Sequence, residues 1–329
     1  MPGNTVVLTV TYGKRAQYID KMVSQLVADR NVLRIVLVDN GSDNIPRLDQ
    51  IARHFASKVI IIHTGKNAGS AVGFASGLQY VFRNLRMAEY IWLLDDDNLP
   101  AAGCLDTLLN YYKDDSTGDS IYSAFREDRR ELLTSGDNHY ISNSFFGFDL
   151  KMKLKLRKRR VSNKRRNNLI LCDTVPYGGL LLPFKVAEKN GLPDTRYVLY
   201  NDDNDYTYRL TKSGLHLYVC VDALIHDQES SWYRREKVPM FQGFFNTDML
   251  RNAVYTVRNR TYFEKNNIVT NNILYSLNIG VYLSYVFLFY MPKTKNGLKR
   301  FLLIKRMIKK GLQGELGPLK SDEYEYAVR

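Results

Sequence analysis

The amino-acid sequence predicts an α/β fold: a mostly parallel, twisted sheet flanked by helices, followed by a helical C-terminal region. Over the first hundred residues, β-branched apolar runs alternate with segments of helical periodicity, and this alternation is typical of parallel strands covered on both faces. Beyond about residue 240 the pattern becomes helical, and no charged residue occurs from Asn266 to Pro292. We therefore expect two parts, residues 1–238 built on the sheet and residues 239–329 built of helices.

The expected elements follow one another regularly along the chain. Buried strands are expected at residues 5–12, 34–42, 58–65 and 90–98, and helices at residues 16–29 and 70–85. Further on, the pattern predicts an extended segment with a glycine turn at 171–183, a helix at 201–214 and a strand at 215–227. Because ligands of such sheets bind where the carboxyl ends of the strands meet, polar residues that follow the strands are site candidates.

Composition limits the class of protein. A chain of 329 residues with 45% hydrophobic and 12% aromatic residues can bury a sizeable core, which excludes wholesale disorder. Three widely spaced cysteines without metal-ligand spacing favour free thiols in a reducing cytoplasm. The N-terminus runs directly into the first strand, so we expect no secretory signal.

The net charge of +13 is unevenly distributed. Residues 151–166 hold ten Lys or Arg and no acid, and a second basic cluster occupies residues 293–310. Basic clusters predict an anionic partner, which here is a nucleic acid, an anionic lipid or a phosphate-bearing substrate. A solvated loop that only maintains solubility is the alternative.

Three consecutive acids follow a buried strand in YIWLLDDDNLP, residues 90–100. Asp95, Asp96 and Asp97 repel one another unless a cation lies among them. Carboxylate oxygens suit Mg²⁺ or Mn²⁺, which is bound together with water and substrate phosphate. Asp95 and Asp97 are therefore candidate metal ligands, with a loop of solvated acids as the alternative.

Other polar residues stand at further strand ends. Asp39 and Asn67 follow the second and third expected strands, and His226 lies at the end of the last one. A histidine ligand would shift the metal preference toward Mn²⁺, although a lone histidine at a strand end is commonly structural. Asp202 and Asp203 begin a helix, where they serve either to accept a proton from an alcohol or to compensate the helix dipole.

Glycines recur every fourth residue in GKNAGSAVGFASGL, residues 65–78. The segment lacks both the dinucleotide-binding and the P-loop patterns. Glycines at this spacing allow either close approach of a nucleotide to the backbone or tight packing of a helix on the sheet.

The ordered motifs VVLTVTYGK, IVLVDNGSDN, NAGSAVGFASGL, WLLDDDN, YGGLLLP and NDDNDYTYRL, with a late histidine, resemble the family 2 glycosyltransferases of GT-A fold. The resemblance covers about residues 5–230. RNAVYTVRN (251–259) and KKGLQGELG (309–317) are similar to the galactofuranosyl- and rhamnosyltransferase branch.

The resemblance implies a role for each matching residue. Asp95, Asp97 and His226 match the metal ligands, and Asp96 the residue near the donor ribose. Asp39 matches the aspartate that recognises the pyrimidine, with Thr9 and Thr11 in the same pocket and Asn67 beside the nucleotide. Asp203 matches the catalytic base and Asp202 its acidic neighbour. Asp202, where Glu is frequent, and Asn204, where a small or apolar residue is usual, depart from the family pattern.

These assignments predict an inverting, metal-dependent transfer from a nucleotide sugar, with UDP-galactofuranose or another UDP-hexose favoured over dTDP-rhamnose. The acceptor implied is a polyprenyl-diphosphate-linked glycan, such as O-antigen or capsule, at the inner face of the cytoplasmic membrane. Residues 273–291 are expected to lie on the anionic membrane surface, to be buried in the protein or in a homo-oligomer, or to span the bilayer.

Three rival functions share some of these features. A nucleic-acid-binding protein would use the same positive charge, but no recognised nucleic-acid module occurs, so we expect no nucleic-acid partner. A sugar-phosphate nucleotidyltransferase would require a loop rich in glycine and arginine after the first strand, and TVTYGKRAQ contains one glycine. A non-catalytic scaffold accounts least well for so many spaced acids.

Overall fold

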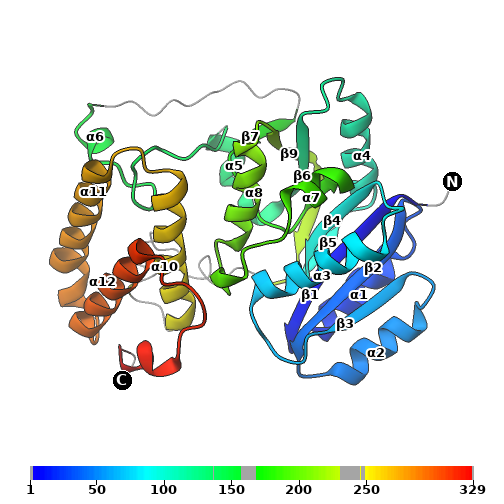
Figure 1. The fold of residues 1–329 in the computed structure, drawn as a ribbon, viewed down its shortest axis with the longest axis horizontal. Coiled ribbons are helices and arrows are strands. Elements are labelled where there is room, and N and C mark those ends of the chain that lie inside the picture. The colour runs from blue at the N-terminus through cyan, green and yellow to red at the C-terminus, as the bar shows by residue number, and fades with distance from the viewer. Residues whose placement is uncertain (1–2, 136, 157–167, 230–244, 246–248, 328–329) are drawn as a thin grey trace. The chain divides into compact units, whose positions relative to one another are not determined.

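The computed structural model describes residues 3–135, 137–156, 168–229, 245 and 249–327 of the chain (Figure 1). It divides into two compact units. The sheet unit comprises Met1–His139, Val161–Thr195 and Asp202–Glu229, and the helical unit comprises Tyr140–Arg160, Arg196–Asn201 and Ser230–Arg329. The predicted boundary at residue 238 lies outside the described residues.

Within the described residues the sheet unit has nine strands in one sheet, of order β3-β2-β1-β4-β8-β6-β9-β5, with β7 also paired to β9. The strands are β1 (Thr5–Gly13), β2 (Val32–Ser42), β3 (Val59–His63), β4 (Tyr90–Asp95), β5 (Asn98–Pro100), β6 (Ser120–Arg126), β7 (Leu169–Cys172), β8 (Leu180–Pro183) and β9 (His216–Asp227). The pairings make β1, β2, β3, β4, β6 and β9 run in one direction, with β5, β7 and β8 opposed. The sheet is thus mixed, but most of its strands are parallel.

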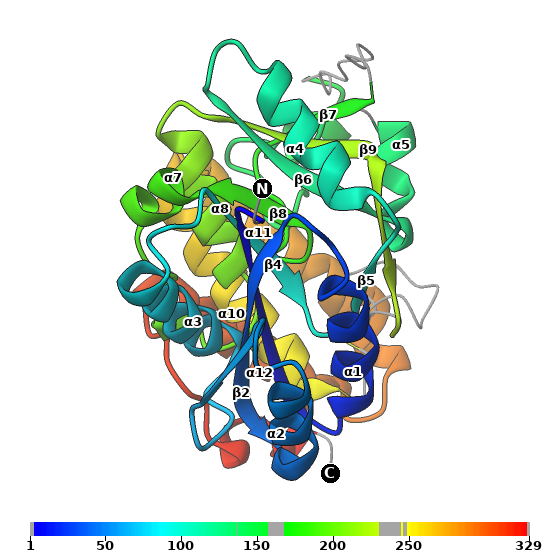
Figure 2. The ribbon, with the colours of Figure 1, turned by 90° about the vertical axis from the view of Figure 1, so that its right-hand side faces the viewer.

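Helices cover both faces of this sheet. They are α1 (Ala16–Leu26), α2 (Ile45–His54), α3 (Ser70–Asn84), α4 (Cys104–Asp114), α5 (Glu131–Ser135), α7 (Phe184–Asn190) and α8 (Asp202–Lys212). Alternate residues of the buried strands face opposite layers: Leu8 packs in a core with α3, α7 and α8, and Val7 in a core with α1, α2 and α4. Figure 2 shows α3 and α1 on opposite sides of β1 and β2.

The glycines of α3 let this helix approach the sheet closely. A Cβ atom on Gly73 would lie 2.4 Å from Val10 Cγ1, and one on Gly77 would lie 2.3 Å from Leu8 Cδ1. Both distances are far below van der Waals contact, so side chains at these positions would push α3 away from β1. The glycine spacing therefore serves helix packing, which is one of the two roles that the sequence predicted.

The helical unit packs three long helices around a second core. They are α10 (Leu250–Asn267), α11 (Asn272–Tyr285) and α12 (Gly297–Gln313); a π-helical turn (Val286–Tyr290) and a 3₁₀ turn (Met291–Lys293) follow α11, and the short α6 (Leu150–Lys153) precedes them. Remaining 3₁₀ turns lie at Glu127–Arg129, Thr195–Tyr197, Ser321–Glu323 and Glu325–Ala327. Met307 and Val286 are wholly buried in this core. Of the predicted basic stretch 151–166, residues 157–166 lie outside the described residues.

The arginine and asparagine of α10 hold backbone carbonyls in place. Asn259 Nδ2 donates to the carbonyl oxygens of Tyr197, Leu199 and Tyr200 at 2.8, 2.7 and 3.0 Å. Tyr200 has a φ of 64°, a left-handed conformation that costs a side-chain-bearing residue conformational energy. Arg258 Nη1 donates to Gly317 O at 2.7 Å. The motif at 251–259 thus organises the segment that directly precedes Asp202.

Close contact between α10 and α12 predicts an asymmetric effect of two Gly→Ala changes. A Cβ atom on Gly311 of α12 would lie 2.4 Å from Arg258 O, whereas one on Gly280 of α11 would have no heavy atom within 4 Å. Gly311→Ala should lower the free energy of unfolding by about 1–3 kcal/mol through overpacking. Gly280→Ala should be neutral or stabilising by up to about 1 kcal/mol, since alanine favours helix. Chemical denaturation of both variants measures this; equal effects would contradict the packing.

Candidate active site

The carboxyl ends of three neighbouring strands bring the predicted residues to one edge of the sheet. Thr11 of β1 lies opposite Asp39 of β2, and Val10 lies opposite Asp95 of β4. At the end of β9 the backbone N–H of Gln228 donates to Asp97 O at 2.8 Å, so the strand that carries His226 ends beside the acids. The parallel alternation of the sequence predicted this convergence, and the register produces it.

Asp96 lies in the turn between β4 and β5 and is almost wholly buried. It accepts a hydrogen bond from Thr11 Oγ1 at 2.9 Å and pairs with Arg15, which also pairs with Glu229. Burial raises the pKa of Asp96 to about 6, although Arg15 and Thr11 act against this shift. The turn is thereby fastened to β1.

Arg126, at the end of β6, joins two acids of the site. Its Nη1 lies 2.7 Å from Asp95 Oδ2, and its Nη2 lies 2.6 Å from Asp227 Oδ1. Asn98 completes the arrangement: its side chain accepts from Asp95 N at 3.0 Å and donates to Asp227 Oδ1 at 2.8 Å. A Cβ atom on Gly178 would lie 2.4 Å from Asn98 Oδ1 and 2.6 Å from Asp95 Oδ2, so only glycine fits beside this group.

Asp97 is buried close to the carboxyl groups of Asp95 and Asp96. It is 8% exposed, and burial together with the charges of Asp95 and Asp96 raises its pKa to about 7, with Arg126 and Arg15 acting against this shift. Hard carboxylate ligands held in an electronegative turn suit a divalent cation, which would relieve the repulsion. Asp95 and Asp97 thus have the chemistry that the sequence predicted for a metal site.

His226 forms a contact outside the turn of Asp95, Asp96 and Asp97, here called the acidic turn. Its Nδ1 lies 2.8 Å from Glu127 Oε2, and both side chains are nearly half exposed. In the part of the chain that the structure describes, no three His, Cys, Asp or Glu side chains are gathered closely enough to hold a metal ion. The ligand set Asp95, Asp97 and His226 stays a prediction, and a site on carboxylates alone would rely on water and substrate phosphate for its remaining ligands.

Asp39 is buried and held by a histidine that sequence analysis did not single out. His63 of β3 lies opposite Asp39, with its Nδ1 2.8 Å from Asp39 Oδ2 and its Nε2 3.1 Å from Asp49 Oδ1. Asp39 Oδ1 also accepts from Ser42 N at 2.8 Å. Hydrogen bonding to Asp39 raises the pKa of His63. This pair fixes the orientation of the carboxylate at the edge of the sheet.

The predicted neighbours of Asp39 differ in accessibility. Thr9 is wholly buried, and its Oγ1 has no hydrogen-bond partner among the described residues. Asn67 is exposed in the loop before α3, where its Oδ1 accepts from Gly69 N at 3.1 Å. A Cβ atom on Gly41 would lie 2.4 Å from Asn67 N, so this loop rests against the segment that follows Asp39.

Asp202 and Asp203 begin α8 in unlike environments. Asp202 is 2% exposed and accepts from Ser70 Oγ at 3.1 and 3.0 Å, which ties α8 to the start of α3. Asp203 is partly exposed. Burial raises the pKa of Asp203 to about 6. The charge of Asp95 also raises the pKa values of Asp202 and Asp203. The pair therefore lies within electrostatic range of the acidic turn.

Comparison with known proteins agrees with this geometry. Residues 6–175, more than half of the chain, match the family described as glycosyl transferase family 2. The chain is a family 2 glycosyltransferase. This glycosyltransferase is 26% identical over 268 residues to galactofuranosyltransferase GlfT1 of Mycolicibacterium smegmatis, covering 78% of this chain and 81% of that protein. It falls in the galactofuranosyltransferase-like branch, as the sequence motifs implied.

Solved structures support the GT-A fold of this glycosyltransferase. Mannosyltransferase PcManGT from Pyrobaculum calidifontis, in complex with GDP-Man and Mn²⁺, is 14% identical with a TM-score of 0.51, covering 96% of this chain and 88% of that one. GalNAc-T7 with UDP, GalNAc and Mn²⁺ is 13% identical with a TM-score of 0.52. The match covers 79% of this glycosyltransferase and spans about half of GalNAc-T7, 51% of its chain.

Replacing Arg126 should strongly lower the stability of the fold. In Arg126→Met, Asp95 and Asp227 would lose their shared partner, and Asp227 is nearly buried. We expect a loss of about 3–5 kcal/mol in the free energy of unfolding. Arg86→Met removes an exposed pair with Glu188 and should cost at most about 1 kcal/mol. Chemical denaturation compares the two variants. Similar losses in the free energy of unfolding would show that Arg126 stabilises the fold no more than an exposed arginine does.

The His63–Asp39 pair predicts a pH-dependent contribution to stability. Because hydrogen bonding raises the folded-state pKa of His63, the charged histidine stabilises the fold below its unfolded value of about 6.5. That contribution is lost as the pH rises through the raised value. Unfolding free energies of the native protein and His63→Gln should therefore differ most near about pH 5.5 and converge toward about pH 9. A difference between the two proteins that stays constant from about pH 5.5 to about pH 9 would contradict this pairing.

Proposed function

We propose that this glycosyltransferase transfers a hexose, with galactofuranose favoured, from a UDP-sugar to a hydroxyl group of a glycan acceptor, with inversion of the anomeric configuration. One observation carries the proposal: the acidic turn of β4 and the Asp202–Asp203 pair of α8 lie within electrostatic range at one edge of the sheet. Carboxylates suit both roles: they hold a metal ion that binds the donor diphosphate, and they accept the proton of an acceptor hydroxyl. The similarity to GlfT1 supports galactofuranose as the sugar.

The donor would bind along the strand ends. Asp39, oriented by His63, would accept a hydrogen bond from the pyrimidine, beside Thr11 and the loop that contains Asn67. Asp96, which is fastened by Thr11 and Arg15, would face the ribose. Asp95 and Asp97, with His226 as the third candidate, would hold Mn²⁺ or Mg²⁺, which when bound would neutralise the charge that develops on the departing diphosphate. Arg126 would keep Asp95 in place.

Asp203 is the better candidate for the general base. Asp202 is buried and its carboxylate is occupied by Ser70, whereas Asp203 is partly exposed and can meet an acceptor. A raised pKa makes Asp203 a stronger proton acceptor in its ionised form. It would remove the proton of the acceptor hydroxyl as the oxygen attacks the anomeric carbon from the face opposite the diphosphate. Such a single displacement inverts the configuration.

The acceptor proposed is a polyprenyl-diphosphate-linked cell-surface glycan, such as O-antigen or capsule. We place the reaction at the inner face of the cytoplasmic membrane, with the protein attached peripherally. Supporting this location, one helix among the described residues, Asn272–Lys293, is long and apolar enough to cross a membrane, and an 18-residue window of it has a mean hydropathy of 1.5. Only 28% of that window is buried.

Replacing the base should abolish turnover and spare donor binding. Asp203→Asn should lower kcat by about 10²–10⁴-fold, because general-base assistance is typically of this size. Asp205→Asn on the same helix, where Asp205 pairs with Arg209 at 3.4 Å, should change kcat by less than a few-fold. Radiolabelled sugar transfer gives kcat, and calorimetry with UDP gives donor affinity. Near-normal turnover of Asp203→Asn would remove the base assignment.

Chelation should stop the reaction reversibly. EDTA should abolish transfer, and Mn²⁺ or Mg²⁺ should restore it. A readout without turnover is thermal stability: UDP should raise the melting temperature more with Mn²⁺ than without it, and Asp97→Asn should lose this difference. Screening UDP-galactofuranose, UDP-galactopyranose and dTDP-rhamnose by the same method identifies the donor. Full activity in EDTA would exclude the metal role of Asp95, Asp97 and His226.

A further inference from the structure

Helix α11 is apolar on both of its faces. Its buried face includes Tyr275, Ile279 and Tyr282, which pack in the core of the helical unit. On the opposite face Ile273 is 76% exposed and Leu277 is 53% exposed. A helix on a water-exposed surface normally presents polar residues outward, and a contiguous exposed apolar surface marks a site of interaction.

This apolar surface continues beyond α11. Exposed apolar side chains, here called the lipid face, occupy α11, the π-helical turn after it and the start of α12: Ile273, Leu277, Phe287, Leu288, Phe289, Leu298 and Leu302. On α11 and its turn the spacing of positions 273, 277 and 288 follows one side of a helix. These three positions therefore form a stripe along α11 and its turn, in which the exposed Ser284 also lies.

Polar contacts on the buried face tie α11 to its own unit. Asn278 Oδ1 accepts from Leu150 N at 2.9 Å, and its Nδ2 donates to Asn143 O at 2.7 Å. Tyr275 donates to the buried Glu264, which also pairs with Arg260 at 2.9 Å. Charged residues of α10 thus lie against α11, and immersing them in hydrocarbon would be unfavourable. These contacts favour a helix that lies along a bilayer over one that crosses it.

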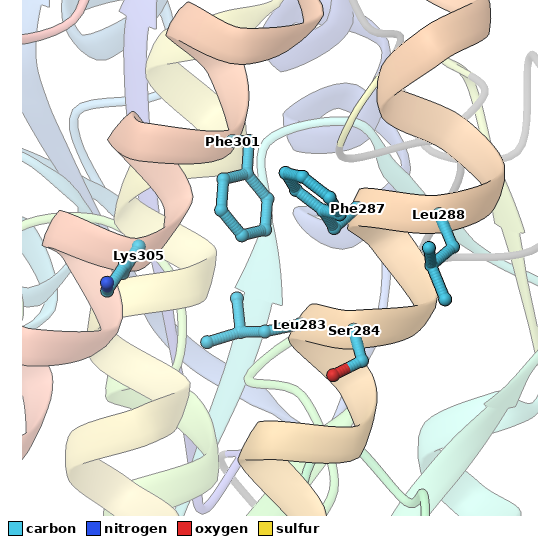
Figure 3. A pocket seen from close by; sticks show the side chains of 6 residues that line it. All are labelled: Leu283, Ser284, Phe287, Leu288, Phe301 and Lys305. Carbon is cyan, nitrogen blue, oxygen red and sulfur yellow. The ribbon is translucent and has the colours of Figure 1, made fainter.

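A groove opens between the π-helical turn and α12. It has a volume of about 410 Å³ and is lined by Leu283, Ser284, Phe287, Leu288, Phe301 and Lys305. Figure 3 shows the rings of Phe287 and Phe301 next to each other, with Lys305 on the opposite wall from Leu288. The two ring centroids are 5.4 Å apart. Apolar walls with a single cation suit an amphiphile that has one chain and an anionic head group.

The sequence around the groove is mostly basic. Residues 293–310 include eight Lys or Arg, and no Asp or Glu occurs from residue 265 to residue 314. Arg306 and Lys310 pair with Glu323, whereas Lys305 and Lys309 are exposed. Apolar side chains bordered by lysines are the signature of a helix that lies in the interface of an anionic membrane.

We propose that the lipid face binds an anionic phospholipid bilayer, and that the groove takes one acyl chain whose phosphate contacts Lys305. The proposal deepens the membrane location given under the proposed function and rests on it. Vesicle binding is measured without any sugar transfer. A failure of the lipid-binding proposal can therefore be told apart from a failure of the proposed transferase activity.

Vesicle co-sedimentation of the full chain tests the apolar contacts. The protein should sediment with vesicles of equal parts phosphatidylcholine and phosphatidylglycerol, and much less with phosphatidylcholine alone. Leu277→Gln with Leu288→Gln should weaken binding by about tenfold or more, since both side chains would leave the bilayer. Met87→Gln, which alters a side chain 69% exposed in the sheet unit, should not weaken it. Circular dichroism verifies that each variant is folded.

A matched pair of lysines tests the phosphate contact. Lys305→Gln should weaken binding to the anionic vesicles by about fivefold, which corresponds to about 1 kcal/mol per basic residue at a membrane surface. Lys189→Gln, an exposed lysine of α7, should leave binding unchanged. Equal effects of the two changes would overturn the assignment of the phosphate to Lys305.

Fluorescence tests the groove itself. Phe287→Trp adds a tryptophan to the groove wall, and lipids with brominated acyl chains should quench the emission of this tryptophan. The unsubstituted protein gives the quenching of the two native tryptophans and serves as the reference. Absence of additional quenching would overturn the acyl-chain occupant. Absence of vesicle binding would overturn the whole proposal. Self-association without lipid that is abolished by Leu277→Gln with Leu288→Gln would also overturn it, because a second copy of the chain would then cover the lipid face.

Discussion

The site depends on how buried negative charge is balanced at one edge of the sheet. Asp95, Asp96 and Asp227 converge there because β4 and β9 end close together, and two arginines hold them: Arg126 from β6 and Arg15 after β1. Without these cations the desolvation of the carboxylates would oppose folding. Burial, together with the charges of Asp95 and Asp96, raises the pKa of Asp97. A cation bound beside Asp97 would offset this burial and repulsion, which is the role proposed for the metal.

The two arginines act on different sides of the acidic turn. Arg15 links Asp96 to β1 and to Glu229, so it positions the side that the pyrimidine nucleotide is proposed to occupy. Arg126 links Asp95 to β9 and lies beside Gly178, where any side chain would collide with the group. A guanidinium can serve two carboxylates at once because its donors diverge in a plane, which a lysine cannot reproduce. The turn is therefore held from both sides in one conformation.

Sequence reasoning predicted the parts of the site that local pattern determines. Apolar runs followed by acids predicted β4 and its turn, and the glycine spacing predicted a closely packed α3, because both signals lie within a few residues. Sequence reasoning did not identify Arg126 and His63, because their roles depend on strand pairing. For example, β6 pairs in the sheet with β8 and β9, which are distant from it in the sequence. One signal was present, since both residues also stand at strand ends. Of the short antiparallel strands, β8 and the end of β7 fall within the extended segment predicted at 171–183, whereas β5 was not separated from the strand predicted at 90–98.

The interleaving of the two units has a consequence for how the chain acquires its structure during synthesis. The helical unit draws Tyr140–Arg160 and Arg196–Asn201 from within the sequence of the sheet unit. These segments leave the ribosome well before α10, whose Asn259 fastens the backbone at Tyr197–Tyr200. The connection into α8 must therefore wait for the C-terminal helices to emerge. A nascent chain that stalls before residue 250 would lack α10, so the carbonyl groups of Tyr197, Leu199 and Tyr200 would have no Asn259 side chain to bind.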